Sequence, residues 1–473
     1  MMEIPCGMQE QFLEAKELIE SSNDIKIYTH TDCDGICSGA ILSIILDRLN
    51  KDYEIEFVNL DEIEDLDLDH KLTIFSDLGS GQGVDKNAKD GQKILILDHH
   101  PPLRDINYKN DKAYTYLEIN PMFYGIDGSY YVCGGGLCYF LAKTFGFKDL
   151  SWIGVLSAIG DMQNNKTGHF EGLNEIIQKD AINEGLLKVT KNDLNIYGRS
   201  TRPLYVALSY FSDVKLPTTN NQQEAKVVLE ELGVDEKHNR KTLSEVTEED
   251  KMEIKKFLSR MISKRVPPKY LKYVPKLIVG DAYTFLNEEE GSFLRDGSEF
   301  STAMNACGRN RKEAIGVDII KGDRIVALDS LEEVSKTHKY NLATSISKVA
   351  DNYHSEIIEL DNFQYFDCSD FDEDIASNII GTITGMVLGY CNWKKPILGF
   401  SKPKNNQIKV SLRCSKLLAY DGIHFGNIMR EIAKEVGGTG GGHAIACGAY
   451  IPNEKKSEFL DKFNRKLQGK IAN

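Results

Sequence analysis

Short apolar runs alternate with helix-like segments through the first third of the chain. Runs of four to eight aliphatic and β-branched residues are typical of strands in a parallel sheet that is buried on both faces. The segments 38–50 and 134–143, which lie between such runs, have apolar residues at helical spacing. This alternation predicts an α/β domain with right-handed crossovers over residues 1–167. The runs are IKIYT (25–29), EIEFV (54–58), LTIFS (72–76), KILIL (93–97) and WIGVLSAIG (152–160), the last of which could equally be a helix.

The pattern changes over residues 168–324, which are polar and rich in charged side chains. Within this segment Thr247 is followed three residues later by Asp250, and an apolar pattern with helical spacing comes next. A threonine and an acid at this spacing favour a helix start. The pair Pro267–Pro268 is a natural break in regular structure. We therefore predict a helical insertion or connector.

Apolar runs return from about residue 325 to residue 473 and predict a second, smaller α/β domain. These runs are DRIVALDS (323–330), HSEIIELD (354–361), KPILGFSK (395–402) and NQIKVSLR (406–413). The domain ends on a glycine-rich segment, GGTGGGHAIACGAYI (437–451).

Composition narrows the class of protein. The chain has 473 residues, of which 41% are hydrophobic and 27% are charged, as in ordinary soluble globular proteins. No apolar run reaches the roughly 18 residues of a membrane span, and the N-terminal segment lacks the regions of a signal peptide. We therefore expect a cytoplasmic protein without a membrane partner. The net charge of -14 argues against a protein that coats nucleic acid, but it allows an enzyme that takes a polyanion at a cation-loaded cleft.

Acids and histidines gather where the apolar runs of the first domain end. Open α/β sheets place their ligand sites at such ends. A single aspartate there is usually a helix cap, but four groups, with HxDxDG and DHH among them, indicate a shared site. Carboxylates and imidazoles without a thiolate favour Mn²⁺ or Mg²⁺ over zinc. The residues are His30, Asp32 and Asp34 after the first run, Asp77 after the third, Asp98, His99 and His100 after the fourth, and Asp161 after the fifth.

The number of these residues suits two metal ions. Two cations about 3.5–4 Å apart share a bridging carboxylate and stabilise the entering and leaving oxygens of an in-line displacement at phosphorus. Gly35 follows Asp34, and we expect it to let the backbone bend so that both Asp32 and Asp34 face the cleft. The sequence thus predicts phosphoester hydrolysis.

The glycine-rich segment predicts a second binding site, in the C-terminal domain. Successive backbone N–H groups with few side chains suit a phosphate or the edge of a nucleotide. Arg413 ends the preceding run and can clamp a phosphate in bidentate fashion, and His443 can hydrogen-bond a non-bridging oxygen. The alternative interpretation of the segment is a flexible turn.

These motifs, in this order, resemble those of the DHH phosphoesterase superfamily. The matching segments are HTDCDG (30–35), SDLG (76–79), LDHHPP (97–102), NPMFYGIDG (120–128) and GDM (160–162). VSLR (410–413) and GGTGGGH (437–443) resemble its C-terminal DHH-associated domain. TRPLY (201–205) and SEFSTAMNACGRN (298–310) resemble segments of archaeal RecJ-like proteins.

The resemblance implies a manganese-dependent exonuclease that releases mononucleotides from single-stranded DNA or RNA in replication or repair. It implies a substrate groove between the two α/β domains and a partnership with GINS and the replicative helicase. It divides the chain into a DHH catalytic domain (1–167), a helical insertion (168–324) and a DHH-associated domain (325–473). DNA and RNA both remain open, and 5′→3′ digestion is the expected polarity.

The resemblance also implies roles for single residues. One ion would take His30, Asp77 and either Asp32 or Asp34, and the other would take the remaining aspartate, the bridging Asp77, His99 and Asp161. Asp98 would orient a histidine, and His100 would face the scissile phosphate. The nucleotide would be held by Arg309, Arg413, Gly440, Gly441, Gly442 and His443.

Three other functions remain open at this point. The substrate can be a very short oligonucleotide or a cyclic dinucleotide, although a chain of this length exceeds what such a substrate needs. The protein can be a replication scaffold, although every metal position is present. An inorganic pyrophosphatase ranks last.

Overall fold

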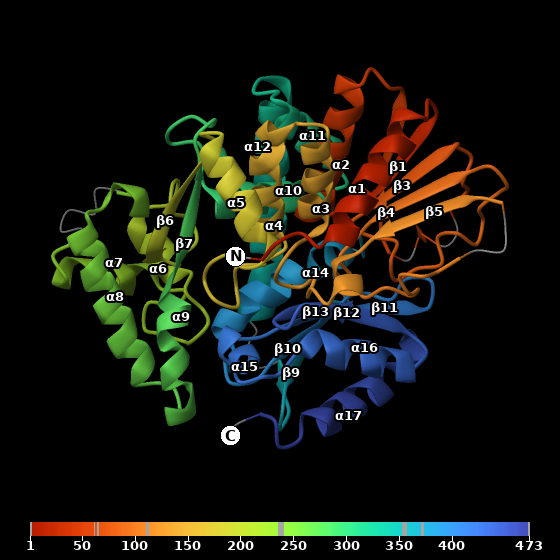
Figure 1. The fold of residues 1–473 in the computed structure, drawn as a ribbon. Coiled ribbons are helices and arrows are strands. Elements are labelled where there is room, and N and C mark those ends of the chain that lie inside the picture. The colour runs from red at the N-terminus through yellow and green to blue at the C-terminus, as the bar shows by residue number, and fades with distance from the viewer. Residues whose placement is uncertain are drawn as a thin grey trace. The chain divides into compact units, whose positions relative to one another are not determined.

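The computed structural model describes residues 2–60, 62–63, 66–109, 113–234, 241–351, 357–369 and 373–471. They form two compact units, each assembled from two stretches of the chain. The first unit contains Met1–Asn192 and Asp281–Ser335, and the second contains Asp193–Gly280 and Lys336–Asn473. The predicted class is confirmed: an α/β fold with a parallel N-terminal sheet, a helical region and a C-terminal sheet domain (Figure 1). The domain boundaries after residues 167 and 324 stay predictions.

The first unit contains a five-stranded parallel sheet with the order β2-β1-β3-β4-β5. Four of the strands are predicted apolar runs. The fifth, TYLEI, is not among the predicted runs, and its Glu118 is buried. The strands are β1 (Ile25–His30), β2 (Tyr53–Val58), β3 (Leu72–Ser76), β4 (Lys93–Leu97) and β5 (Thr115–Ile119).

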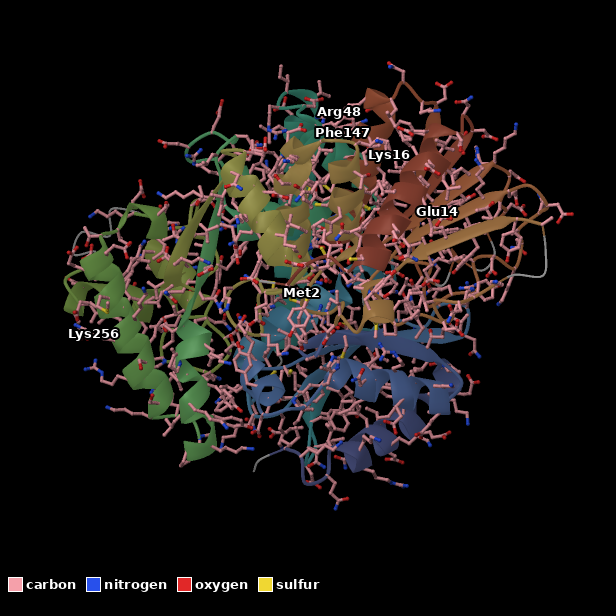
Figure 2. All side chains as sticks on the ribbon, viewed as in Figure 1. Met2, Glu14, Lys16, Arg48, Phe147 and Lys256 are labelled. Carbon is pink, nitrogen blue, oxygen red and sulfur yellow. The ribbon has the colours of Figure 1, made fainter. Side chains whose placement is uncertain are left out.

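Both faces of this sheet are covered. Ile27 and Ile74 face a core that includes residues of the helices, whereas Tyr28 and Phe75 face a second core built with connecting loops. Near-continuous apolar strands follow from burial on both sides. The helices of the first core include α1 (Cys6–Glu20), α2 (Cys33–Arg48), α3 (Gly134–Thr144), α4 (Ser151–Gly160), α5 (Leu173–Asn183), α10 (Gly297–Arg309) and α11 (Glu313–Lys321). At the end of α2, the Arg48 guanidinium lies over the Phe147 ring at 4.7 Å (Figure 2).

Two apolar runs are helices. Residues 152–160 lie in α4, so the helical alternative for this run is confirmed. The run 323–330, which we expect at the start of the second α/β domain, contains the beginning of the long helix α12 (Val326–Asp351). The predicted helical region also contains a strand, β6 (Leu187–Leu194), which pairs with β7 (Val279–Phe285).

The second unit contains a mixed six-stranded sheet with the order β12-β13-β11-β10-β9-β8. Its pairings are antiparallel except that of β9 with β10, among the strands described. Part of the predicted run 354–361, residues 354–356, lies outside the described residues. The strands are β8 (Ile358–Glu359), β9 (Gln364–Asp367), β10 (Ile397–Phe400), β11 (Gln407–Arg413), β12 (Thr439–Gly442) and β13 (Ala446–Pro452).

The second unit takes its first helices from residues 193–280, the middle part of the predicted helical insertion (168–324), whereas α5, α10 and α11 of that region lie in the first unit. Thr247 caps α8 and forms a capping box with Asp250, which confirms the predicted helix start. Pro268 begins a 3-10 helix, η5 (Pro268–Tyr273), as expected for a break at the Pro-Pro pair. The helices are α6 (Leu204–Ser209), α7 (Gln222–Glu231), α8 (Glu248–Ser263), α9 (Val274–Ile278), α14 (Glu373–Val387), α15 (Lys416–Tyr420), α16 (Phe425–Glu435) and α17 (Lys456–Leu467). Within the described ranges, no helix combines the length and apolarity of a membrane span.

Candidate metal centre

The carboxyl edge of the parallel sheet collects the predicted ligands of the first unit. His30 is the last residue of β1, Asp77 directly follows β3, and 98–100 directly follow β4. Parallel strands end at the same edge, so these residues become neighbours although they are far apart in the chain. Asp161 directly follows the helix α4 rather than a strand.

Two ligand groups form at this edge. Each has donor atoms within 4.8 Å of one another, and the groups are His30, Asp32 and Asp77, and Asp34, His99 and Asp161. His30 Nδ1 lies 3.1 Å from Asp32 Oδ2 and 3.5 Å from Asp77 Oδ2. His99 Nε2 lies 3.2 Å from Asp77 Oδ1 and 3.6 Å from Asp34 Oδ2. Asp77 thus presents one oxygen to each group, as a bridging ligand does.

The first turn of α2 holds the two aspartates of the first motif. Asp32 is the N-cap of the helix, and its Oδ1 accepts a hydrogen bond of 3.1 Å from the Gly35 N–H. A Cβ at Gly35 would collide with the backbone carbonyl of His30. Gly35 therefore acts by permitting this close approach, since it is part of a regular helical turn and not of the bend that we expected.

The carboxylate of Asp34 is fixed by a helix start from elsewhere in the chain. Its Oδ2 accepts from Gly134 N at 2.9 Å, its Oδ1 accepts from Gly135 N at 2.7 Å, and the Ser157 hydroxyl also donates to Oδ1. A Cβ at Gly134 would lie 2.6 Å from Asp77 Cβ, so the glycines also admit the bridging residue. Sequence reasoning missed these partners. The only signal was the triple glycine at 134–136, where a predicted helical segment begins.

Asp161 and His99 share supporting residues. Gln163 Nε2 donates to Asp161 Oδ2 at 2.8 Å and to Gly128 O at 2.7 Å. His99 Nδ1 also lies 2.7 Å from Gly128 O, so this nitrogen donates to the carbonyl and Nε2 is the nitrogen that faces the carboxylates. Asn174 in turn donates to Gln163 Oε1 at 2.5 Å. The imidazole of His99 is therefore oriented in the way that metal-binding histidines usually are.

Asp98 holds the loop that carries His100. Its Oδ1 accepts from the backbone N–H groups of His99 and His100 and from His100 Nδ1 at 2.7, 3.2 and 2.8 Å. Its Oδ2 accepts from Ser80 N at 2.9 Å. Asn120 adds a hydrogen bond of 2.8 Å to the carbonyl of His100. Asp77, Asp98, His99 and His100 are also close enough to form a further ligand group. Both carboxylate oxygens of Asp98 already accept hydrogen bonds, so we infer that Asp98 positions His100 rather than binding a metal ion.

The electrostatics of the centre favour added positive charge. Burial and the carboxylate of Asp34 raise the pKa of Asp77 well above its usual range. Burial and Asp161 raise the pKa of Asp34. Burial opposes the charged form of His99, yet the charge of Asp161 and the contact with Asp77 leave its pKa well above the usual value. Several buried carboxylates that repel one another are stabilised by a cation between them.

The donor set fits a hard divalent ion. Two buried atoms inside the cluster, Asp77 Oδ2 and His99 Nε2, make no hydrogen bond to any described residue. A buried polar atom without a partner costs about 1–3 kcal/mol, and a metal ion removes this cost. Carboxylate oxygens and imidazole nitrogens without a thiolate are the ligands expected for Mn²⁺ or Mg²⁺.

The NACGR segment supports the first motif. Asn305 Oδ1 accepts a hydrogen bond of 3.1 Å from Cys33 N, and a Cβ at Gly308 would collide with the carbonyl of Thr31. Arg309 is the last residue of α10, directly after Gly308, and is half-buried. This segment thus reaches the HTDCDG loop, and Arg309 lies in the same unit as the metal cluster.

The other predicted substrate residues lie in the second unit. Arg413 ends β11 and pairs in register with Ala446, whose carbonyl accepts from His443 N at 2.9 Å, so Arg413 and His443 share one end of the sheet. Arg413 is half-buried, and burial lowers the pKa of its guanidinium. Gly440 and Gly442 lie in β12, paired with β13, so the glycine-rich segment is a strand and its turn rather than an open loop. Gly441 also lies in β12, and a Cβ there would be 3.1 Å from Arg430 Nη2, a cation that the motifs did not indicate.

Comparison with known proteins assigns the family. The sequence matches the DHH family N-terminal domain over residues 24–155, the DHH-CID domain over 196–274 and the DHHA1 domain over 361–469. It is 30% identical over 446 residues to the uncharacterized protein MJ0831 of Methanocaldococcus jannaschii, covering 93% of this chain and 92% of that protein. The chain belongs to the DHH family.

Two solved structures share the fold of this DHH protein. CDC45 from Entamoeba histolytica aligns with a TM-score of 0.62 and 14% identity, covering 98% of this chain and 99% of that one. RecJ from Thermus thermophilus, solved in complex with Mn²⁺, aligns with a TM-score of 0.54 and 12% identity, covering 99% of this chain and 55% of that one. The predicted resemblance to RecJ-like DHH proteins is confirmed.

Proposed function

We propose that this DHH protein is a metal-dependent phosphodiesterase that degrades single-stranded DNA or RNA to mononucleotides. The observation that carries the proposal is the pair of ligand groups, one of His30, Asp32 and Asp77 and one of Asp34, His99 and Asp161, with Asp77 presenting one oxygen to the histidine of each. Asp77 Oδ2 and His99 Nε2 are buried and have no hydrogen-bond partners among the described residues. When bound, two ions would supply charge stabilisation for the entering and leaving oxygens of an in-line displacement. Mn²⁺ is the preferred ion, and Mg²⁺ is the alternative.

The residues of the chain have separate tasks in this proposal. One ion would be held by His30, Asp32 and Asp77, and the other by Asp34, His99, Asp161 and the shared Asp77. His100 is the catalytic residue that faces the scissile phosphate. Its Nδ1 is held by Asp98, and its side chain is 41% exposed, which leaves Nε2 available to a phosphate oxygen or a leaving group.

Arg309, Arg413, His443 and the glycines 440–442 would hold the nucleotide. The guanidinium of Arg413 lies beside Gly381, where a Cβ would be 3.0 Å from Nη2, so small residues keep room around the charge. An arginine whose burial weakens its hydration is well suited to bind a phosphate.

The polymer substrate is supported by the family and by the fold. The neighbouring structures are RecJ in complex with Mn²⁺ and an exonuclease RecJ bound to manganese. The DHH-CID and DHHA1 segments add a large second unit, which exceeds what a dinucleotide requires. The oligonucleotide and cyclic-dinucleotide substrates are the alternatives within the same chemistry.

A role as a replication factor is a second candidate, supported by the fold shared with CDC45. The expected partners GINS and the replicative helicase, and the cytoplasmic location, stay predictions. The full ligand set favours an enzyme that also binds a protein partner, rather than a scaffold without catalysis.

The test is digestion of end-labelled single-stranded DNA and RNA of one sequence, with Mn²⁺, with Mg²⁺ and with EDTA. Asp98→Ala/His99→Ala is the inactive control. We expect metal-dependent release of mononucleotides that the double variant does not produce. Intact strands under all conditions, with hydrolysis of dinucleotides, would move the assignment to small substrates. No hydrolysis of either class would refute the proposal.

A further inference from the structure

The second unit contains a strongly basic tract in an otherwise acidic chain. Between Glu253 and Asp281 there are eight basic residues and no acidic ones, although the chain as a whole has 71 acidic and 57 basic residues. The basic residues are Lys255, Lys256, Arg260, Lys264, Arg265, Lys269, Lys272 and Lys276. The tract runs from α8 through η5 to α9.

Most of these cations are available to a ligand. The six basic residues from Arg260 to Lys276 are exposed, and of these Lys269 pairs with Asp421 at 2.6 Å. Within the described part of the chain, no carboxylate lies within ion-pair distance of the other five, which are Arg260, Lys264, Arg265, Lys272 and Lys276. By contrast, Lys256 on α8 (labelled in Figure 2) pairs with Glu253 at 2.7 Å. Unpaired cations keep their charge for a polyanion, and the acidic surplus elsewhere makes this tract the favoured place for one.

Two tyrosine rings lie among the lysines. The rings of Tyr273 and Tyr420 are 5.6 Å apart between centroids. Lys272 Nζ lies 4.7 Å from the centre of the Tyr273 ring, and Lys276 Nζ lies 5.6 Å from that of Tyr420. Both rings are half-buried, so each has part of its surface in contact with solvent. We call Lys272, Tyr273, Lys276 and Tyr420 the Tyr–Lys cluster.

We propose that the basic tract and its Tyr–Lys cluster bind the backbone and bases of a single-stranded nucleic acid. Lysines contact phosphates as point charges, and aromatic rings stack on bases of any sequence. An acidic peptide would use the cations but not the exposed part of the tyrosine rings, whereas a single-stranded nucleic acid would use both. The inference rests on the proposed function, because it assigns part of the strand's path to the unit that lacks the metal ligands.

The test is binding of fluorescein-labelled oligothymidylate and oligouridylate to the full chain in EDTA, followed by fluorescence anisotropy over a range of salt. Each phosphate contact with a single strand adds about 0.7 to the magnitude of the slope of log affinity against log salt. Between 1 M and 0.1 M salt, each contact therefore raises the affinity about 5-fold. Lys272→Gln/Lys276→Gln should therefore bind about 25-fold more weakly near 0.1 M salt, with a slope lower by about 1.4. Tyr273→Leu should weaken binding about tenfold without changing the slope.

Matched variants separate this effect from loss of charge or of fold. Lys462→Gln/Lys466→Gln removes the same charge from the same unit, but these lysines pair with Glu435 and Glu431, so binding should stay near that of the parent. Lys272→Arg/Lys276→Arg should keep the parental slope. Thermal unfolding of each variant checks the fold.

The outcomes distinguish this inference from the proposed function. Parental affinity and slope in Lys272→Gln/Lys276→Gln would overturn the inference while hydrolysis of single strands still supported the proposed function. If the variant loses binding of a labelled polyglutamate peptide but not of oligonucleotide, the tract docks an acidic protein and the inference is wrong. A parent chain that neither binds nor hydrolyses single strands would refute both.

Discussion

The hydroxyl of Ser157 offers a sharp test of how the metal centre is built. It is buried on α4 and donates to Asp34 Oδ1, which also accepts from Gly135 N at 2.7 Å. Ser157→Ala removes this donor and leaves the remaining shape almost unchanged. A hydrogen bond to a charged group contributes about 1.5–3 kcal/mol, so the variant should lose about this much stability in EDTA. For a unit of this size, the loss corresponds to about 2–4 °C in Tm per kcal/mol.

The effect should grow when metal is present. Loss of a partner that orients a metal ligand typically lowers affinity about 10–100-fold. In excess Mn²⁺ this adds about 1.4–2.7 kcal/mol to the difference in stability between the parent and Ser157→Ala. Thermal unfolding in EDTA and across a Mn²⁺ titration measures both contributions, and calorimetric titration gives the affinity directly.

Ser43→Ala is the matched control. Ser43 is also buried on a helix of the first unit, and its hydroxyl donates to the carbonyl of Ala40 at 3.0 Å. Ser43→Ala should lower the free energy of unfolding by about 0.5–1.5 kcal/mol and leave the response to Mn²⁺ unchanged. If Ser157→Ala bound Mn²⁺ as the parent does, the two backbone N–H groups of Gly134 and Gly135 would be sufficient to hold Asp34, and the positioning role of Ser157 would be wrong.

Four further perturbations test other parts of the account. Asp77→Ala should abolish hydrolysis and bind Mn²⁺ at least tenfold more weakly; substantial activity with Mn²⁺ would contradict a bridging role. Arg413→Ala should raise KM about tenfold with little change in kcat, and a pure rate defect in steady-state kinetics would exclude the binding role. Gly308→Ala should lower the free energy of unfolding by about 1–3 kcal/mol, measured by urea denaturation, because the added Cβ meets a backbone carbonyl. Burial raises the pKa of Asp85, but hydrogen bonds from two tyrosine hydroxyls outweigh burial and leave this pKa below its usual value. The Asp85 carboxylate therefore stabilises the folded state above the pKa of the unfolded chain, and this stabilisation is lost as pH falls. Asp85→Asn should reduce the fall in the free energy of unfolding at acid pH, measured by urea denaturation. An unchanged fall would show that another carboxylate dominates.

Local patterns carried enough information to predict the parallel sheet and the ends of its strands. The runs 25–29 and 72–76 each have three apolar or aromatic residues among five, and they are followed directly by His30 and Asp77. Period alone could not separate strand from helix in 152–160, because a buried helix and a buried strand are both apolar on every side. It also could not predict that a helix begins within the run 323–330, at Val326.

The supporting contacts of the centre were beyond the reach of the sequence. Asp34 and Ser157 are brought together by tertiary packing of α2 against α4, and Asn305 reaches the first motif from much later in the chain. No local spacing encodes such pairs. The basic tract in 254–280 can be found in the sequence as a local run of Lys and Arg, but the negative net charge of the whole chain does not indicate it.

Manganese binding tests the central claim most directly. Protein stripped of metal with EDTA and dialysed is titrated with Mn²⁺ and followed by electron paramagnetic resonance. The account predicts two Mn²⁺ per chain with an exchange-coupled signal, and loss of that coupling in Asp77→Ala, because this carboxylate presents one oxygen to each ligand group. A single Mn²⁺ per chain, or two ions without coupling in the parent, would contradict a centre built around Asp77.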